Sequence, residues 1–237
     1  MRARQKFLRR AVWYAFLFWT TALCAQNSAA NAPGVVWRFN RIDSLGGHAT
    51  TMVGHPHVID SPYGKAVEFN GVDDALFVGV HPLAHAATFT WEVIFRPDAG
   101  GGAQQRFFHL QETDPLTGAD TGNRMLFEIR VIDGKWCLDS FDITAGHRLA
   151  LLNCKLMHPL GEWYRVTFVY DGKEMRNYVG DVLQDSGAVQ LEPQGEGRTS
   201  IGTRINKTYY FKGAILMARM TPRALQPNEF LALPPAR

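Results

Sequence analysis

The stretch that decides the fold runs from Lys65 to Pro97, KAVEFNGVDDALFVGVHPLAHAATFTWEVIFRP. From residue 89 onward, large apolar side chains alternate with mostly polar ones, and this period of two predicts a β-strand with two distinct faces. Shorter strands are predicted over 67–69 and 76–80, with a turn at Asn70-Gly71 between them. Aromatic and β-branched strands spaced about ten residues apart are typical of a sandwich of two sheets. The alternating positions are Phe89, Trp91, Val93 and Phe95 on one face, and Thr90, Glu92, Ile94 and Arg96 on the other.

The rest of the chain continues this pattern of short strands and turns. Asp133-Gly134 is a strong signal for a hairpin turn. Residues 112–123 are expected to form a long polar loop, and residues 222–233 a short terminal helix, because Gln226-Pro-Asn-Glu resembles a helix start. Since the sequence has no other helical pattern, the predicted fold class is all-β. Further strands are predicted over 35–39, 106–111, 124–132, 135–141, 149–156, 163–170, 175–183, 198–202 and 211–220.

The first 25 residues have the features of a secretory signal peptide. A basic start without acids precedes an apolar run over 11–23, and Cys24-Ala25-Gln26 follows. Cleavage after Ala25 leaves a flexible leader over 26–34 and a domain over 35–233, which we expect to be secreted, periplasmic or on the cell surface. The apolar run is short for a permanent membrane span. A membrane anchor and lipid modification of Cys24 stay open as alternatives, although Leu23 stands where a lipoprotein signal usually has a small residue.

Loss of the signal peptide changes the net charge of the protein. The whole chain carries +3 and the signal peptide carries +5, so the mature protein is left with 3 − 5 = −2. The basic isoelectric point therefore belongs to the signal peptide. Because no basic stripe is left to neutralise phosphates, we expect no nucleic-acid partner.

Two cysteines remain after removal of the signal peptide. Cys137 and Cys154 lie at the edges of two predicted strands, and export gives them access to an oxidising environment. We therefore predict a disulfide, which would add about 3 kcal/mol of stability in the chain-entropy model. Two buried thiols are the alternative.

Four segments follow one another in the order and spacing of a known family. They are GKAVEFNG at 64–71 with Asp73-Asp74 after it; FTWEVIFRP at 89–97; GEWYRVTFVYDG at 161–172 with Tyr178-Val179 after it; and Ile201-Gly202, FKGAI at 211–215 and the segment from Arg223 to Phe230. Together they resemble the laminin-G-like branch of the concanavalin A-like jelly rolls. The resemblance implies a sandwich of two antiparallel sheets. It does not imply one function, because this fold carries lectins, adhesive modules, glycosidases and lyases.

The resemblance also implies a metal site. Members of the family often hold a structural calcium ion, for which Asn70, Asp73 and Asp74 are the candidate ligands here. The acid that commonly follows the family's F-x-G-x-I motif is Leu216 in this chain, and loss of a carboxylate weakens a site that needs about six to eight oxygen ligands. The alternative is that these residues only make turns. No other cofactor is expected.

A polar ligand site is predicted on the strand faces that point away from the core. The alternation places charged residues at strand centres, where buried faces are normally apolar. One interpretation is a groove that binds a sugar through bidentate hydrogen bonds, with Trp136 or Tyr209-Tyr210 as stacking platforms. The other is a ladder of cross-strand Glu–Arg ion pairs. We expect one face to present the candidate ligand-binding residues, which are Glu92, Arg96, His109, Gln111, Glu128 and Arg130, with Asp139 nearby.

Three functional hypotheses follow. The favoured one is an exported, lectin-like or adhesive domain that binds a polysaccharide or glycoconjugate. The second is an exported glycosidase or lyase, with Glu92 or Glu128 as acid and base, or His109 as proton acceptor beside Arg130. Glycosidase branches of the fold carry a Glu-x-Asp-x-x-Glu run, which this sequence lacks, so no catalytic residue is assigned. The third is a structural or protein-interaction domain whose partner the sequence does not identify.

Overall fold

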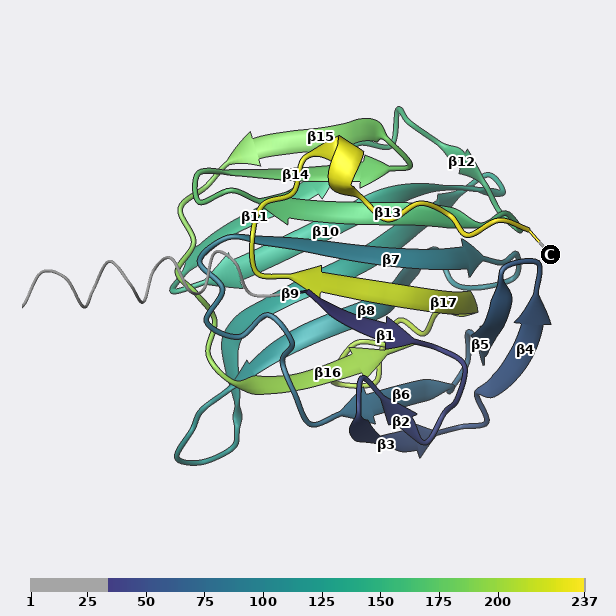
Figure 1. Ribbon diagram of the computed structural model, residues 1–237, viewed down its shortest axis with the longest axis horizontal. Coiled ribbons are helices and arrows are strands. Elements are labelled where there is room, and N and C mark those ends of the chain that lie inside the picture. Colours follow the sequence, from purple (N-terminus) through teal and green to yellow (C-terminus); the bar gives the residue numbers. More distant parts are fainter. Residues whose placement is uncertain (1–33, 237) are drawn as a thin grey trace, which may run out of the picture. The chain divides into compact units, whose positions relative to one another are not determined.

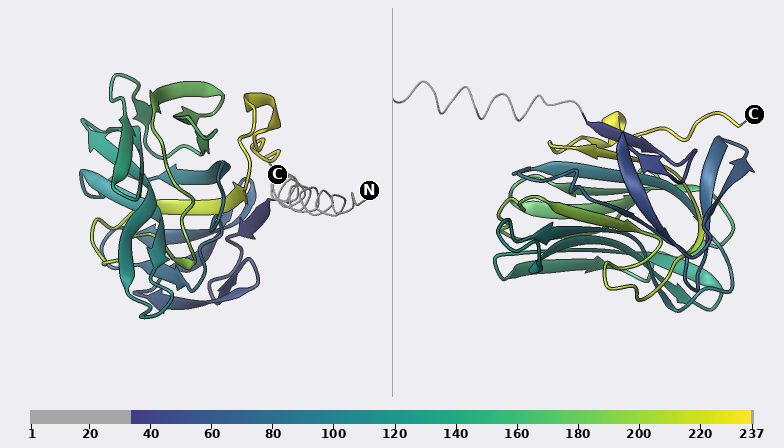
Figure 2. Two further views of the ribbon diagram at one scale, coloured as in Figure 1. Left: turned by 90° about the vertical axis from the view of Figure 1, so that its left-hand side faces the viewer. Right: turned by 90° about the horizontal axis from the view of Figure 1, so that it is seen from below.

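The computed structural model of the chain describes residues 34–236. The predicted signal peptide and the leader up to residue 33 lie outside the described residues. The described chain forms two antiparallel sheets packed face to face, as the front and side views show (Figures 1 and 2). This architecture confirms the predicted all-β sandwich. Within residues 34–236, no helix has the length and apolar character that a membrane crossing requires.

The first sheet has the fold-deciding strand near its middle. β7 (Phe89–Pro97) pairs with β13 on one side and with β17 on the other. The order across the sheet is β15 (Val182–Ala188), β14 (Glu174–Val179), β13 (Tyr164–Tyr170), β7, β17 (Lys212–Thr221), β5 (Gly64–Asn70) and β4 (His57–Ser61), and β1 (Val35–Arg38) also pairs with β17.

The second sheet is centred on two long strands. β8 (Gln104–Thr113) and β9 (Asp120–Ile132) pair along most of their length. The order is β11 (His147–Leu152), β10 (Lys135–Thr144), β9, β8, β16 (Gly197–Ile201), β6 (Ala75–Val78), β3 (His48–Val53) and β2 (Ser44–Leu45), and β12 (His158–Pro159) also pairs with β10.

The core between the sheets is built mainly from aromatic side chains. Phe107 of β8 stacks on Phe95 of β7 and on Phe127 of β9, with ring centroids 4.4 Å and 5.5 Å apart. Trp91 lies 4.6 Å from Phe127. Such pairs contribute about 0.5–1.5 kcal/mol each beyond the burial of their area. All four apolar positions of β7 lie in this core, as the alternation predicts.

The segment after β17 is not the predicted terminal helix. Only Pro227–Glu229 form one turn of 3₁₀ helix (η1), and the neighbouring residues run across the outer face of the first sheet (Figure 1, yellow). Leu225 and Phe230 pack against Val169 and Tyr178 of that face. Two anchors five residues apart would point to different sides of a helix, so packing both on one flat sheet favours an extended path.

Cys137 of β10 and Cys154, just after β11, form the predicted disulfide. The bond links positions 17 residues apart in the sequence, and Cys137 is fully buried. It therefore ties the loop after β11 to β10, the neighbouring strand of the second sheet.

A buried polar cluster lies at one end of the core. Asp142 is buried, and its Oδ1 accepts hydrogen bonds from Gln194 Nε2 at 2.9 Å and from Thr144 Oγ1 at 3.4 Å. His81 Nε2 lies 3.2 Å from the side-chain Oε1 of Gln194. Burial raises the pKa of Asp142 to about 8 and lowers the pKa of His81 to about 4. Both groups are therefore neutral at pH 7.

Candidate functional site

The predicted ligand-binding residues are divided between the two sheets. Glu92 and Arg96 point outward from β7 of the first sheet, whereas the other five residues lie on β8, β9 and β10 of the second. The inner faces of both sheets meet in the core, so their outer faces point in opposite directions. The expectation that the candidate residues share one face is therefore wrong. Alternation identifies an outward side chain but does not say which sheet carries it.

Glu92 is a buried anchor for the C-terminal segment. Its Oε2 accepts a hydrogen bond from Arg219 Nε at 2.5 Å, and its Oε1 accepts one from the backbone N–H of Leu231 at 2.6 Å. Arg165 Nη1 donates to the carbonyl oxygen of Leu231 at 2.5 Å. Because Glu92 has no exposed surface, it holds the C-terminal segment on the sheet and is closed to a ligand.

Arg96 also has its own partners on the first sheet. Its guanidinium pairs with Asp98 at 2.8 Å and with Glu68 at 3.0 Å, and lies 5.5 Å from the ring centre of Trp163. On this sheet the predicted ion-pair interpretation describes the contacts well.

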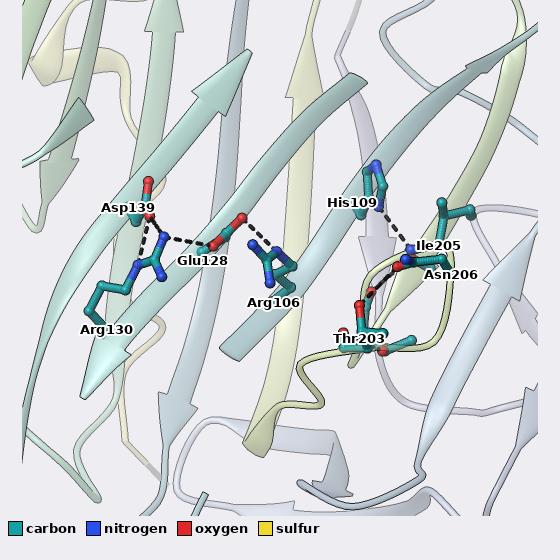
Figure 3. Close-up of polar contacts among 10 residues, drawn as sticks. Arg106, His109, Glu128, Arg130, Asp139, Thr203, Ile205 and Asn206 are labelled. Carbon is teal, nitrogen blue, oxygen red and sulfur yellow. Dashed lines mark hydrogen bonds and ion pairs between the residues drawn. The ribbon is translucent and has the colours of Figure 1, made fainter. Parts of the chain in front are cut away.

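Four charged side chains form a row across the outer face of the second sheet (Figure 3). Arg106 Nε donates to Glu128 Oε1 at 2.7 Å. Arg130 bridges the two acids, with its Nη2 3.3 Å from Glu128 Oε2 and its Nε 2.9 Å from Asp139 Oδ2. The strand register places Arg106, Glu128 and Asp139 directly opposite one another on β8, β9 and β10. The row therefore follows from cross-strand pairing.

The two carboxylates of this row are almost completely buried. The side chains of Glu128 and Asp139 are each 4% exposed. Burial and the neighbouring Asp139 charge raise the pKa of Glu128, while Arg106 and Arg130 oppose that shift. The arginines thus act as the counterions that keep two adjacent acids in one place.

The row borders a pocket of about 160 Å³ on the same face. Four arginines and two acids line it together with three apolar side chains, and we call it the arginine pocket. Its lining residues are Arg106, Arg124, Leu126, Glu128, Arg130, Asp139, Phe141, Ala150 and Arg204.

Arg106 reaches the pocket because β8 contains a bulge. The register with β9 shifts between Arg106 and Phe108, so that Phe107 and Phe108 are both buried while Arg106 lies on the outer face. The backbone N–H of Arg106 donates to the carbonyl oxygen of Tyr209 at 2.9 Å, and its guanidinium lies 3.9 Å from the Tyr209 ring centre. Tyr209 therefore holds Arg106 in place by stacking. Trp136, which was also predicted as a stacking platform for a sugar, is buried in the core.

Two further arginines of the pocket were not predicted. Arg124 lies 5.2 Å from the ring centre of Phe141 and donates to the carbonyl oxygen of Gly122 at 2.9 Å. Burial, followed by the positive charges of Arg204 and Arg106, lowers the pKa of Arg124. Arg124 continues the alternation upstream of Glu128 and could have been found from it. Arg204 lies in the loop between β16 and β17, where no sequence pattern points to it.

His109 fixes the loop that carries Arg204. Its Nδ1 accepts a hydrogen bond from the backbone N–H of Ile205 at 2.9 Å (Figure 3). Burial, followed by the charges of Arg204 and Arg124, holds the pKa of His109 well below its ordinary value. His109 has no exposed surface, so it is a neutral positioning residue beneath the loop.

Gln111 is buried and joins β8 to β9. Its Nε2 lies within hydrogen-bonding distance of the carbonyl oxygens of Glu112, Thr121 and Asn123, at 2.9, 3.1 and 2.9 Å. These bonds extend the strand pairing, so the polar loop predicted over 112–123 shrinks to 114–119.

The predicted calcium ligands form a turn. Asn70 Oδ1 accepts hydrogen bonds from the backbone N–H groups of Val72 and Asp73 at 2.8 and 3.1 Å. Asp74 is buried, and its two oxygens accept from the N–H groups of His55 at 2.6 Å and Asn70 at 2.9 Å. One amide oxygen and two carboxylates that fold a turn supply fewer oxygens than the about six to eight that calcium takes, so the set does not by itself make a calcium site. Among residues 34–236, no group of three or more His, Cys, Asp or Glu side chains is arranged to hold a metal.

A sequence profile of the concanavalin A-like lectin/glucanases superfamily matches residues 70–230, more than half of the chain. The chain belongs to this superfamily. No curated protein sequence matches it. Membership agrees with the two-sheet architecture and with the ordered segments from which the family was expected.

Solved structures with the same fold come from several kinds of protein. Domain 4 of AbnA, an extracellular GH43 arabinanase from Geobacillus stearothermophilus, was solved with arabinotriose; it has a TM-score of 0.54 and 20% identity, covering 84% of this chain and 86% of that one. The binding domain of Paraclostridial Mosquitocidal Protein 1 has a TM-score of 0.60 and 12% identity, covering 83% and 50%. A K499G mutant of NanB sialidase from Streptococcus pneumoniae has a TM-score of 0.56 and 17% identity, covering 76% and 29%. At these identities the likeness concerns the fold.

Proposed function

We propose that this is an exported domain that binds a polysaccharide or glycoconjugate through the arginine pocket. One observation carries the proposal. The second sheet's outer face carries a pocket lined by four arginines, two acids and three apolar side chains, whereas the hollow of about 490 Å³ beside the C-terminal segment has only Arg165 and Asp181 as charged lining residues. The shared fold with an arabinanase domain solved with arabinotriose supports this function.

The pocket has the mixed chemistry that a sugar requires. Each guanidinium carries five N–H donors, so four arginines hold many more donors than Glu128 and Asp139 can accept. The remaining donors suit hydroxyl and carboxylate oxygens of a sugar. Leu126, Phe141 and Ala150 provide apolar surface for the carbon face of a ring.

The same geometry supports binding better than catalysis. A glycosidase needs two carboxyl groups about 5–9.5 Å apart on either side of one bond. The two glutamates considered for that role, Glu92 and Glu128, lie on different sheets with the core between them. Glu128 and Asp139 do lie together, but both are 4% exposed and held by Arg130, so neither is free to act on a bond of the ligand. His109 has no surface from which to accept a substrate proton.

The proposal is tested by screening the mature chain, residues 26–237, on a glycan array with and without a calcium chelator. Saturable binding to a defined glycan is expected, and Arg130→Ala should reduce it strongly. Arg96→Ala is a matched control, because Arg96 lies on the other sheet with 22% side-chain exposure against 23% for Arg130. Loss of glycan binding in the presence of the chelator would show that binding depends on a metal ion.

A second variant guards against a folding defect in Arg130→Ala. Ala150→Trp would fill the arginine pocket while leaving every charge in place, since Ala150 lies at its edge on β11. Absence of glycan binding by the unmodified chain, or binding that neither variant weakens, would refute the proposed function. N-terminal sequencing of the exported protein tests the export itself, with Gln26 expected as the first residue.

A further inference from the structure

We infer that the group seated in the arginine pocket is an oxyanion, so that the domain selects acidic glycans that carry a carboxylate or a sulfate. The inference rests on the proposed function and specifies its ligand class. It depends on the charge balance of the pocket, on how its arginines are held, and on its size.

The arginine pocket has an excess of positive charge. Four guanidinium groups face two carboxylates, which leaves a local charge of about +2 when the neutral His109 is left out. The mature chain as a whole is expected to carry −2. The excess is therefore a local feature and does not reflect a generally basic protein.

Two of the arginines that line the pocket have no counterion. Most arginines in residues 34–236 lie within 4.0 Å of an acid. Among these described residues, Arg124 and Arg204 have no acid within 4.0 Å, and both line the pocket. Their Nε atoms, together with Arg106 Nη1, are buried without a hydrogen-bond acceptor in the described part of the chain. A buried donor without an acceptor is costly, and an anion beside these guanidinium groups would offset their mutual repulsion.

Contacts within the fold fix the orientation of the pocket arginines before a ligand binds. Tyr209 stacks on Arg106, Phe141 lies beside Arg124, and the bond from Ile205 to His109 fixes the loop of Arg204. A guanidinium whose plane is held presents its N–H edge as a rigid fork, which matches carboxylate and sulfate oxygens in pairs.

The size of the arginine pocket limits how much of a ligand it can hold. The pocket measures about 160 Å³, below the range of about 300–1,000 Å³ that is usual for sites enclosing a whole drug-sized molecule. It suits one charged substituent or one sugar unit, while the rest of a polymer lies along the sheet. Recognition of one charged group on a repeating chain is how such a small pocket would select its ligand.

The test compares matched acidic and neutral polymers on the mature chain by isothermal titration calorimetry. The pairs are polygalacturonate with its methyl ester, and dextran sulfate with its desulfated form, dextran; arabinan is the neutral reference. An acidic polymer should bind about ten- to a hundredfold more tightly than its neutralised form, as expected for charge-assisted hydrogen bonds. Arg204→Gln should remove most of that preference, because it takes away one of the pocket's positive charges. The variant should still fold, since Arg204 lies in a loop between β16 and β17. Arg96→Ala should leave the preference unchanged.

The outcomes separate this inference from the proposed function. Equal binding of acidic and neutral polymers would overturn the inference and leave glycan binding intact. A preference that Arg96→Ala removes as strongly as Arg204→Gln would also overturn it, since the site would then not be the arginine pocket. Loss of preference on methyl esterification would assign a carboxylate, and loss on desulfation a sulfate. Binding of no polymer at all would refute both proposals.

Discussion

Substitution of Glu92 tests whether the C-terminal segment is locked onto the first sheet as the contacts indicate. Glu92→Gln keeps an acceptor for the N–H of Leu231 but places an amide N–H₂ against the Nε–H of Arg219. Because Glu92 is fully buried, the variant removes the counterion of Arg219 in a low-dielectric place. Removing one partner of a buried ion pair costs about 3–5 kcal/mol of stability. Because the Arg219 side chain is partly exposed, we expect the free energy of unfolding to decrease by about 3 kcal/mol.

The assay for this prediction is thermal unfolding together with amide hydrogen exchange. A loss of about 3 kcal/mol corresponds to a decrease in Tm of about 6–12 °C for a domain of this size. The N–H of Leu231 should exchange faster, since the segment opens locally. Glu68→Gln is the control, because Glu68 is 34% exposed and Arg96 keeps Asp98, so the change should stay below about 1 kcal/mol. A Tm for Glu92→Gln within 2 °C of the unmodified protein, as an order-of-magnitude limit, would refute the assigned anchoring role.

Three further predictions concern stability. Asp142 has a folded pKa of about 8, above its ordinary value of 3.8, so its contribution to stability falls as pH rises from about 4 to about 8; the buried His81, with a folded pKa of about 4 against an ordinary 6.5, offsets that fall up to about pH 6.5, so the net decrease should lie between about pH 6.5 and 8, and Asp142→Asn should remove it in urea titrations. Replacement of Cys137 and Cys154 by serine should lower the free energy of unfolding by about 3 kcal/mol, measured by urea titration against the oxidised protein. A calcium chelator should leave the Tm unchanged, because the turn at Asn70 supplies fewer oxygens than a calcium ion takes; a decrease in Tm would show that the site binds metal.

The sequence predicted the fold better than the site. Alternation in β7 identifies which side chains enter the core, because a strand between two layers must bury one face. It also identified the outward residues, but Glu92 and Glu128 give the same local pattern while lying on opposite sides of the molecule. Only the strand order, which is set by contacts far apart in sequence, separates them. The bulge that turns Arg106 outward breaks the period of two and therefore escaped the pattern.

The difference between the two outer faces determines where a ligand can bind. On the first sheet, Glu92 and Arg165 hold the chain's own C-terminal segment through the backbone of Leu231. On the second sheet both acids of the row are paired with arginines, whereas Arg124 and Arg204 have no acidic partner within the described chain. The ion-pair and ligand-site interpretations therefore both apply to the second sheet. The row holds the acids, and the surplus of arginine is what a ligand would meet.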